Sequence, residues 1–181
     1  MTGNTIFISG VYGTGKSTLC NGLTSMMKIP SFSAGDLISA INGERYGANK
    51  AVRDKAYNQT LLAEKVHELN NKHKRIILAG HFCIFNNSNE IEILPETVYF
   101  KLNISQIVLL ETDVSIIANH LNIRDNKNYS IDNLLRLAEG ERSQSEIIAQ
   151  KLNCPLSVYR MMFSEIDVAN VFKLISMEEK P

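Results

Sequence analysis

The sequence predicts a three-layer α/β fold, in which helices cover both faces of a parallel sheet of about five strands. Residues 75–80 and 106–111 are almost wholly apolar, as is typical of strands buried on both faces of a parallel sheet. Stretches with apolar residues at helical spacing alternate with the predicted strands, and this alternation builds a sheet with right-handed crossovers. Ligands of such sheets bind beyond the carboxyl ends of the strands, so we expect the functional site in the loops there.

The first predicted strand, residues 5–8, runs directly into the glycine-rich segment 10–18. Its spacing, a glycine, four residues and then Gly-Lys-Ser, fits the P-loop, whose backbone N–H groups and helix N-terminus surround the phosphates of a nucleotide. Lys16 is expected to reach the β- and γ-phosphates of ATP, and Ser17 to ligate Mg²⁺. An ordinary glycine-rich turn is the alternative, but the strand before and the helix after the segment favour the P-loop. The residues assigned to ATP binding are Gly10, Tyr12, Gly13, Thr14, Gly15, Lys16, Ser17 and Thr18.

The helix after the P-loop is expected to end near Pro30, because proline cannot continue a helix. A short extended piece at 31–33 then turns into a second helix, which Ser33 or Asp36 can cap. A polar loop with two glycines follows, and then a longer helix over about 51–70 with a narrow apolar face.

The strand over 75–80 leads to His81 at the carboxyl edge of the predicted sheet. Residues 83–96 are expected to form a polar, asparagine-rich loop, and loops of this length are usually functional or mobile. The strand over 106–111 is followed by Asp113, which can cap the next helix.

Residues 122–129 are predicted to form a short charged loop, and Ser130 can cap a long helix that ends near residue 152. A last strand over 155–159 and a helix over about 164–176 complete the order. No internal repeat, low-complexity tract or linker interrupts it, so we expect a single domain over 1–181.

The charge balance and the cysteines narrow the class of function. Lys plus Arg and Asp plus Glu number 19 each, so the chain has no basic field of the kind that gathers nucleic acid. Three widely spaced cysteines without a C-x-x-C pair argue against a disulfide framework or a zinc site. No apolar run approaches the roughly 18 residues of a membrane helix, and no leader-like segment begins the chain. We therefore expect a cytoplasmic protein without a nucleic-acid or membrane partner, whose oligomeric state stays open.

Together these segments resemble the P-loop nucleoside monophosphate kinases, most closely the archaeal-type adenylate kinases and their bacterial relatives. Residues 10–17 look like the P-loop of that family, and residues 33–37 are similar to its acceptor-nucleotide segment. Residues 107–113 are similar to a run on its fourth strand, and the short loop around Arg124 looks like its lid. The resemblance covers nearly the whole chain. It implies a kinase that transfers the γ-phosphate of ATP, with Mg²⁺, to a small acceptor, most simply a nucleoside monophosphate.

The chain departs from that family at the acceptor side. No arginine follows soon after the Gly35-Asp36 pair, where such kinases often hold the acceptor phosphate. The third strand ends in Ala79-Gly80-His81, where they often have an aspartate near the metal. Two alternatives therefore stay open: a kinase of a nucleoside or another small hydroxyl metabolite, and a nucleotide-binding accessory ATPase or switch.

Phosphoryl transfer depends on charge neutralisation and in-line positioning, so we assign the catalytic roles to Lys16, Arg124, Arg142 and Asp36. The two arginines would close over the phosphates as lid residues, and otherwise they are solvent-exposed charges. Asp36 could hold Mg²⁺ through water or act as a general base for a hydroxyl acceptor, and otherwise it caps a helix. Ser17 and Asp36 are thus the candidate metal ligands. The residues assigned to acceptor binding are Ser33, Gly35, Asp36, Lys50, Arg53, Gln59 and His81.

Overall fold

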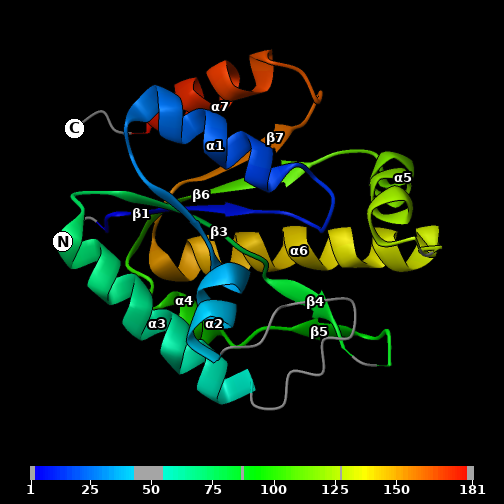
Figure 1. Cartoon of the computed structure of the whole chain (residues 1–181), viewed down its shortest axis with the longest axis horizontal. Coiled ribbons are helices and arrows are strands. Elements are labelled where there is room, and N and C mark those ends of the chain that lie inside the picture. Colours follow the sequence, from blue (N-terminus) through cyan, green and yellow to red (C-terminus); the bar gives the residue numbers. More distant parts are fainter. Residues whose placement is uncertain (1–2, 43–54, 87, 127, 179–181) are drawn as a thin grey trace.

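The computed structural model describes residues 3–42, 55–86, 88–126 and 128–178, and its main sheet has five parallel strands in the order β2-β3-β1-β6-β7 (Figure 1). The strands are β1 (Thr5–Ser9), β2 (Ser31–Ser33), β3 (Ile76–Ala79), β6 (Ile104–Glu111) and β7 (Leu156–Arg160). The predicted α/β fold with about five parallel strands is confirmed.

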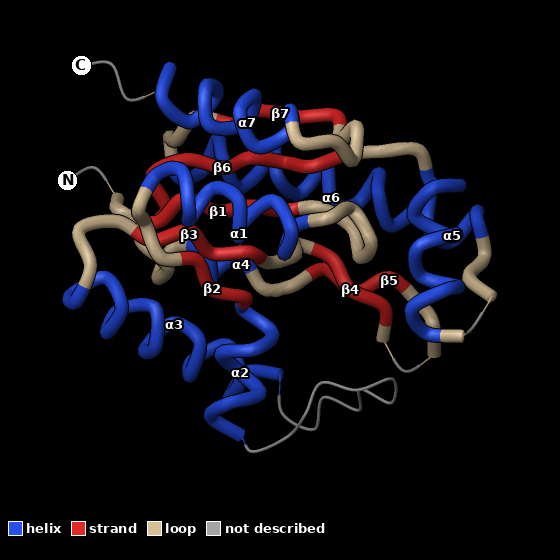
Figure 2. Tube along the Cα trace, turned by 45° about the horizontal axis from the view of Figure 1, so that its top comes forward, coloured by secondary structure: helices blue, strands red, loops and turns tan. Residues whose placement is uncertain are grey.

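Helices cover both faces of this sheet, whose strands Figure 2 shows one below another, from β7 at the top to β2. On one face lie α1 (Lys16–Met27) and α7 (Ile166–Met177), and on the other lie α3 (Lys55–Lys72) and α6 (Ile131–Leu152). Successive side chains of a strand point to opposite faces. Hence Ile6 and Ile8 of β1 belong to the buried cluster under α1 and α7, while Phe7 belongs to the cluster under α3 and α6.

The register of the parallel strands places the functional loops next to one another. Ile8 of β1 pairs with Ala79 of β3, and Ser33 of β2 pairs with the same alanine. Because all three strands run in the same direction, the P-loop after β1, the start of α2 (Ala34–Asn42) and the turn after β3 meet at one edge. The central position of β1 thus gives the P-loop neighbours on its acceptor side.

The asparagine-rich segment after β3 is not the plain loop that its composition predicts. It forms an antiparallel hairpin of β4 (Cys83–Phe85) and β5 (Ile91–Ile93), followed by the short helix α4 (Glu96–Tyr99). Asn86 stabilises the turn: its side-chain carbonyl accepts bonds from the N–H of Ser88 and Glu90, at 2.8 and 2.9 Å. Each strand has three residues, which is too short for a visible alternation.

The charged loop predicted at 122–129 is also shorter than expected. Helix α5 (Val114–Asp125) continues through its first four residues and ends at Asn126, which has the left-handed conformation that closes many helices. Arg124 therefore stands on a helix. Ser130 caps α6 as predicted, accepting a hydrogen bond from the N–H of Asn133. In the described parts of the chain, no helix combines the length and apolar character needed to cross a bilayer.

Candidate active site

A cavity of about 550 Å³ opens at the carboxyl edge of the sheet, where the loops after β1, β2 and β3 meet. This is within the usual size range of small-molecule sites. Its P-loop wall includes Lys16, Ser17 and Thr18, and its far wall includes Asp36 and His81. One cavity therefore joins the predicted donor and acceptor segments.

The P-loop has the backbone conformation that its glycines permit. Gly10 has a φ of 144°, and a Cβ atom there would lie 2.6 Å from the carbonyl oxygen of Leu110. Only glycine allows this close approach of the loop to β6. Within the loop, Lys16 Nζ donates hydrogen bonds to the carbonyl oxygens of Gly10 and Val11, at 2.6 and 3.0 Å. The ammonium group thus lies inside the loop, where it can meet phosphate oxygens.

Burial sets the electrostatics of this lysine. Loss of contact with water lowers the pKa of Lys16 to about 8, and the carboxylate of Glu141 opposes the shift. The same burial raises the pKa of Glu141, while the charge of Lys16 and three backbone N–H groups favour its ionised form. The two side chains are therefore an electrostatically linked pair beneath the P-loop.

Glu141, behind the cavity wall, is a residue for which the sequence predicted no role. Its side chain, 1% exposed, accepts bonds from the backbone N–H of Gly10 (3.1 Å), Phe82 (3.0 and 2.9 Å) and Cys83 (2.8 Å). The signal for it was present in α6, where Glu141 interrupts the buried series Leu134, Leu137, Ser145 and Ile148 at helical spacing. A glutamate on the apolar face of a helix indicates a buried charge with partners.

The acceptor side combines polar side chains with an apolar interior. Asp36 is exposed in the first turn of α2, and its N–H donates to the hydroxyl of Ser33 at 3.3 Å, so Ser33 is the cap. Asn58 and Gln59 reach the cavity from α3. Deeper in, the wall consists of core residues that are 5% exposed or less: Phe7, Leu62, Val98, Tyr99 and Leu102. Lys50 and Arg53, also predicted here, lie outside the described residues.

Tyr12 belongs to the P-loop, but its ring lies against His81 on the acceptor side, with the ring centroids 4.3 Å apart. Both residues line the cavity. Burial, and then the charge of Glu141, raise the pKa of the Tyr12 phenol, so it stays a neutral hydrogen-bond donor. Tyr12 therefore connects the P-loop to the predicted acceptor wall of the cavity.

The two predicted lid arginines have different surroundings. Arg124, on the last turn of α5, lines the cavity and bonds Asp125 at 2.6 and 2.7 Å. Arg142 is outside the cavity lining, and its guanidinium forms two bonds to Glu111, at 2.7 and 2.6 Å. The structure thus brings Arg124 to the site and holds Arg142 at the end of β6.

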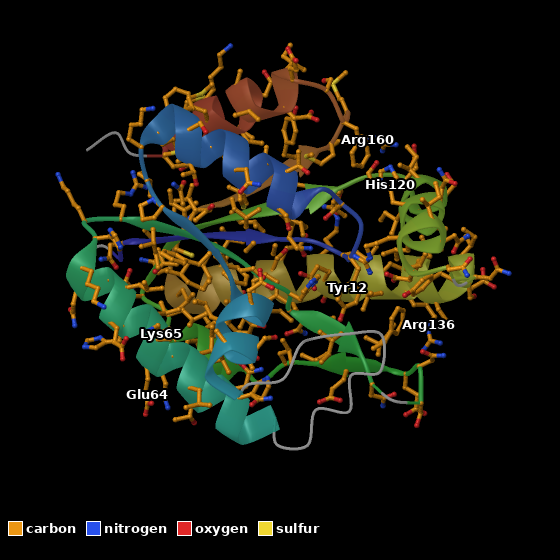
Figure 3. The ribbon with its side chains drawn as sticks, viewed as in Figure 1. Tyr12, Glu64, Lys65, His120, Arg136 and Arg160 are labelled. Atoms are coloured by element: carbon orange, nitrogen blue, oxygen red, sulfur yellow. The ribbon has the colours of Figure 1, made fainter. Side chains whose placement is uncertain are left out.

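A third loop, between β7 and α7, packs against the P-loop. A methyl group on Gly15 would lie 3.4 Å from the ring of Phe163, which is perpendicular to the imidazole of His120 at 4.7 Å. His120 Nδ1 is 3.0 Å from the carbonyl oxygen of Gly13. In the view of Figure 3, His120, on α5, lies higher than Tyr12. Aromatic groups therefore border the loop on the side away from the acceptor wall.

The site suits a metal ion that the nucleotide helps to hold. Among the residues that the structure describes, no group of three or more His, Cys, Asp or Glu side chains could form a complete cage. Ser17 and Asp36 both line the cavity. Mg²⁺ in kinase sites is usually bound by one or two protein groups together with phosphates and water, so these two residues fit that ion.

The chain is similar to a known protein family in sequence and to several solved structures in fold. A family model described as an AAA domain matches residues 9–138. Shikimate kinase from Bacteroides thetaiotaomicron has a similar structure, with a TM-score of 0.65, 17% identity and coverage of 96% of this chain and 98% of that one. Shikimate kinase from Acinetobacter baumannii in complex with shikimate gives 0.62 and 13%, covering 99% and 97%. A gluconokinase from Sinorhizobium meliloti 1021 gives 0.54 and 12%, covering 99% of both chains.

At these identities the likeness shows the fold, which is that of P-loop kinases. It does not single out the adenylate kinases that the sequence resembles. No curated protein matches the chain in a sequence comparison.

Proposed function

The chain belongs to an AAA domain family with a P-loop kinase fold, and on that premise we propose that it is an ATP- and Mg²⁺-dependent kinase of a small hydroxyl compound. The observation that carries this proposal is the shared cavity, in which the P-loop faces Asp36 and His81. Phosphoryl transfer needs a donor and an acceptor held in line in one water-poor site. A cavity walled by both segments meets that need.

The donor end of the site is formed by the P-loop. Backbone N–H groups of the loop and the ammonium of Lys16 would surround the β- and γ-phosphates, replacing the carbonyl contacts that Lys16 makes now. Mg²⁺, held by Ser17 and through water by Asp36, would supply further charge neutralisation. Phe163 and His120 offer aromatic surface beside the loop, which suits the base of the nucleotide. A lid role for Arg124 and Arg142 stays a prediction.

The hydroxyl class of acceptor is favoured by the groups on the far wall. Asp36 is the one carboxylate among the described residues of the cavity wall, and a hydroxyl must lose a proton during attack whereas a phosphate need not. Ser33, Gly35, Gln59 and His81 would orient the acceptor, whose apolar part has Leu62 and Tyr99 to contact. The solved structures of similar fold include shikimate kinases and a gluconokinase, named for such acceptors.

A nucleoside monophosphate, the acceptor that the resemblance implies, is the competing candidate. Its phosphate would need cations on the far wall. The described cations of the cavity, Lys16 and Arg124, belong to the P-loop and to α5. A monophosphate would therefore depend on Lys50 and Arg53, outside the described residues.

Asp36→Asn separates these two candidates. With a hydroxyl acceptor we expect kcat to fall by about 10² to 10⁴-fold, because general-base catalysis is lost, and additional Mg²⁺ should not restore it. The measurement is kcat across a Mg²⁺ titration, using whichever of a panel of metabolites, nucleosides and nucleoside monophosphates is phosphorylated.

Asp132→Asn is the matched control, because Asp132 is an exposed acid in the first turn of α6, as Asp36 is in α2. It removes the same helix-dipole contribution and should keep kcat. Turnover of monophosphates with recovery of Asp36→Asn at high Mg²⁺ would overturn the hydroxyl assignment. ATP hydrolysis that no acceptor accelerates would instead indicate an accessory ATPase.

A further inference from the structure

We propose that Glu141 is a positioning residue, whose single buried carboxylate holds the donor loop and the acceptor wall of the site at a fixed separation. This inference rests on the proposed kinase function for its kinetic consequences. Its geometric basis is the set of backbone N–H groups that converge on the two oxygens.

The carboxylate connects parts of the chain that are distant in sequence. Gly10 lies 131 residues before Glu141, and Phe82 and Cys83 lie 59 and 58 residues before it. Oε1 accepts from Gly10 and Phe82, and Oε2 accepts from Phe82 and Cys83. Each oxygen therefore has two donors, and the Phe82 N–H lies between both oxygens. Movement of either loop would lengthen bonds to the same side chain.

Helix α6 is placed to deliver this group. Gly140, the preceding residue, comes so near the β3–β4 turn that a Cβ atom there would lie 3.3 Å from Cys83 Sγ. Larger side chains at this position would push the helix away from the turn. The close approach lets the Glu141 side chain reach both loops from a rigid helix of 22 residues. Positions supported by a packed helix are held more precisely than positions on loops.

The two loops have different tasks in the proposed reaction. Gly10 opens the P-loop, which binds the donor phosphates. Phe82 directly follows His81, a residue of the acceptor wall, and the carbonyl oxygen of His81 accepts a 2.7 Å bond from the Tyr99 hydroxyl. Glu141 thus fixes one backbone point in the P-loop and another directly after the acceptor-wall residue His81. A misplacement of about 1 Å between reacting groups can lower a rate by about 10²-fold.

Only a carboxylate satisfies this arrangement fully. It is an acceptor at both oxygens, whereas a carboxamide has one oxygen and one NH₂ group. The glutamine of Glu141→Gln has two possible orientations. If its oxygen accepts from Cys83, its NH₂ group faces the N–H of Gly10, and if its oxygen accepts from Gly10, the NH₂ group faces the N–H of Cys83. The shape is kept while one of the two loops loses its anchor. That is the variant required to test a link between loops.

The experiment measures Glu141→Gln against Leu137→Ala in steady-state kinetics. Leu137 is fully buried one turn earlier on α6, so its truncation lowers stability while the Glu141 carboxylate is retained. We expect Glu141→Gln to lower kcat by on the order of 10²-fold, with the KM of ATP and of the acceptor changed much less. Leu137→Ala should keep kcat at temperatures where it is folded. A Glu141→Gln effect confined to KM, or a kcat no lower than that of Leu137→Ala, would overturn the inference.

A second measurement needs no turnover and no variant. In the wild-type protein, a non-hydrolysable ATP analogue should slow amide hydrogen exchange at Phe82 and Cys83 as well as at Gly10, because one carboxylate anchors all three groups. Protection limited to Gly10 would contradict the link. If no acceptor is ever phosphorylated, the proposed function fails, and this exchange experiment still decides the role of Glu141.

Discussion

Two buried carboxylates anchor loops at the same edge of the sheet, and they do so differently. Glu141, from α6, binds backbone N–H groups of two neighbouring loops, each of which contributes residues to the cavity wall. Asp167, from α7 and 2% exposed, binds the N–H of Met162 and Ser164 and the hydroxyl of Tyr159, all near the β7–α7 loop. One carboxylate joins two loops of the site, whereas the other stabilises a single loop beside the P-loop.

A buried carboxylate can thus fix the separation of two parts of a site, as we propose for Glu141, or the conformation of one loop, as Asp167 does. Loss of the Asp167 contacts should loosen only the surface that Phe163 presents to the donor. Loss of the Glu141 contacts should change the distance between donor and acceptor. Glu141 also interacts with a cation, Lys16, whose charge favours the ionised carboxylate. The residue that anchors the two loops therefore also influences the charge of the P-loop lysine.

Removal of that cation should have the largest effect. Lys16→Ala is expected to lower kcat by at least about 10² to 10³-fold, because the charge that stabilises the transferring phosphate is lost. The variant should remain folded, as circular dichroism can check. Lys173→Ala, on the exposed surface of α7, is the control and should retain turnover. A folded Lys16→Ala protein with wild-type rates would disprove the kinase proposal.

Asp167→Asn should have an intermediate effect that falls on donor binding. We expect the KM of ATP to rise several-fold with kcat little changed, because only the loop beside the P-loop loses an anchor. Stability should fall by about 1–3 kcal/mol, the usual cost of leaving a buried polar group unpaired. Initial rates and urea unfolding provide the two measurements. A fall in kcat like that of Glu141→Gln would remove the distinction between the two carboxylates.

Thiol labelling should show the smallest difference. Burial, and then the charge of Glu141, raise the pKa of Cys83 from 9.0 to about 12, so its reactive thiolate is scarce at pH 9. Glu141→Gln removes the negative charge and loosens the turn, and both changes should speed alkylation by iodoacetamide. Peptide mass spectrometry can compare this rate with that of Cys154, whose pKa burial raises to about 11. Asp167→Asn should leave the alkylation rate of Cys83 unchanged. Equal Cys83 rates in Glu141→Gln and Asp167→Asn would contradict a specific effect of Glu141 on this thiol.

Strong local signals made most of the fold predictable. The apolar strands β3 and β6 and the capped helix α6 occur where the sequence predicts them, because burial on two faces leaves an unmistakable apolar pattern. The β4–β5 hairpin was missed because its strands are short and its asparagines are typical of loops. The end of α5 was placed too early, since charged residues are compatible with an exposed helix as well as with a loop.

The site was less predictable, because its contacts join distant segments. The sequence identified the P-loop and predicted that Asp36 and His81 lie at the same carboxyl edge of the sheet, where both line the cavity. It did not indicate that Glu141 binds Gly10, since a bond across 131 residues leaves no local pattern. Nor did it indicate that Arg142 would pair with Glu111, because the choice between a lid and an ion pair depends on how α6 packs against β6.

The central place of β1 has a consequence for the synthesis of the protein. The strand that carries the P-loop acquires its neighbours β3 and β6 only after residues 76–79 and 104–111 have been made. The Glu141 anchor of Gly10 follows 131 residues after it, which at about 5–20 residues per second is a delay of roughly 7 to 26 seconds. The P-loop therefore leaves the ribosome early, but it acquires its neighbouring strands and its bond to Glu141 late. Under the proposed function, ATP would therefore bind and stabilise the domain only when it is nearly complete.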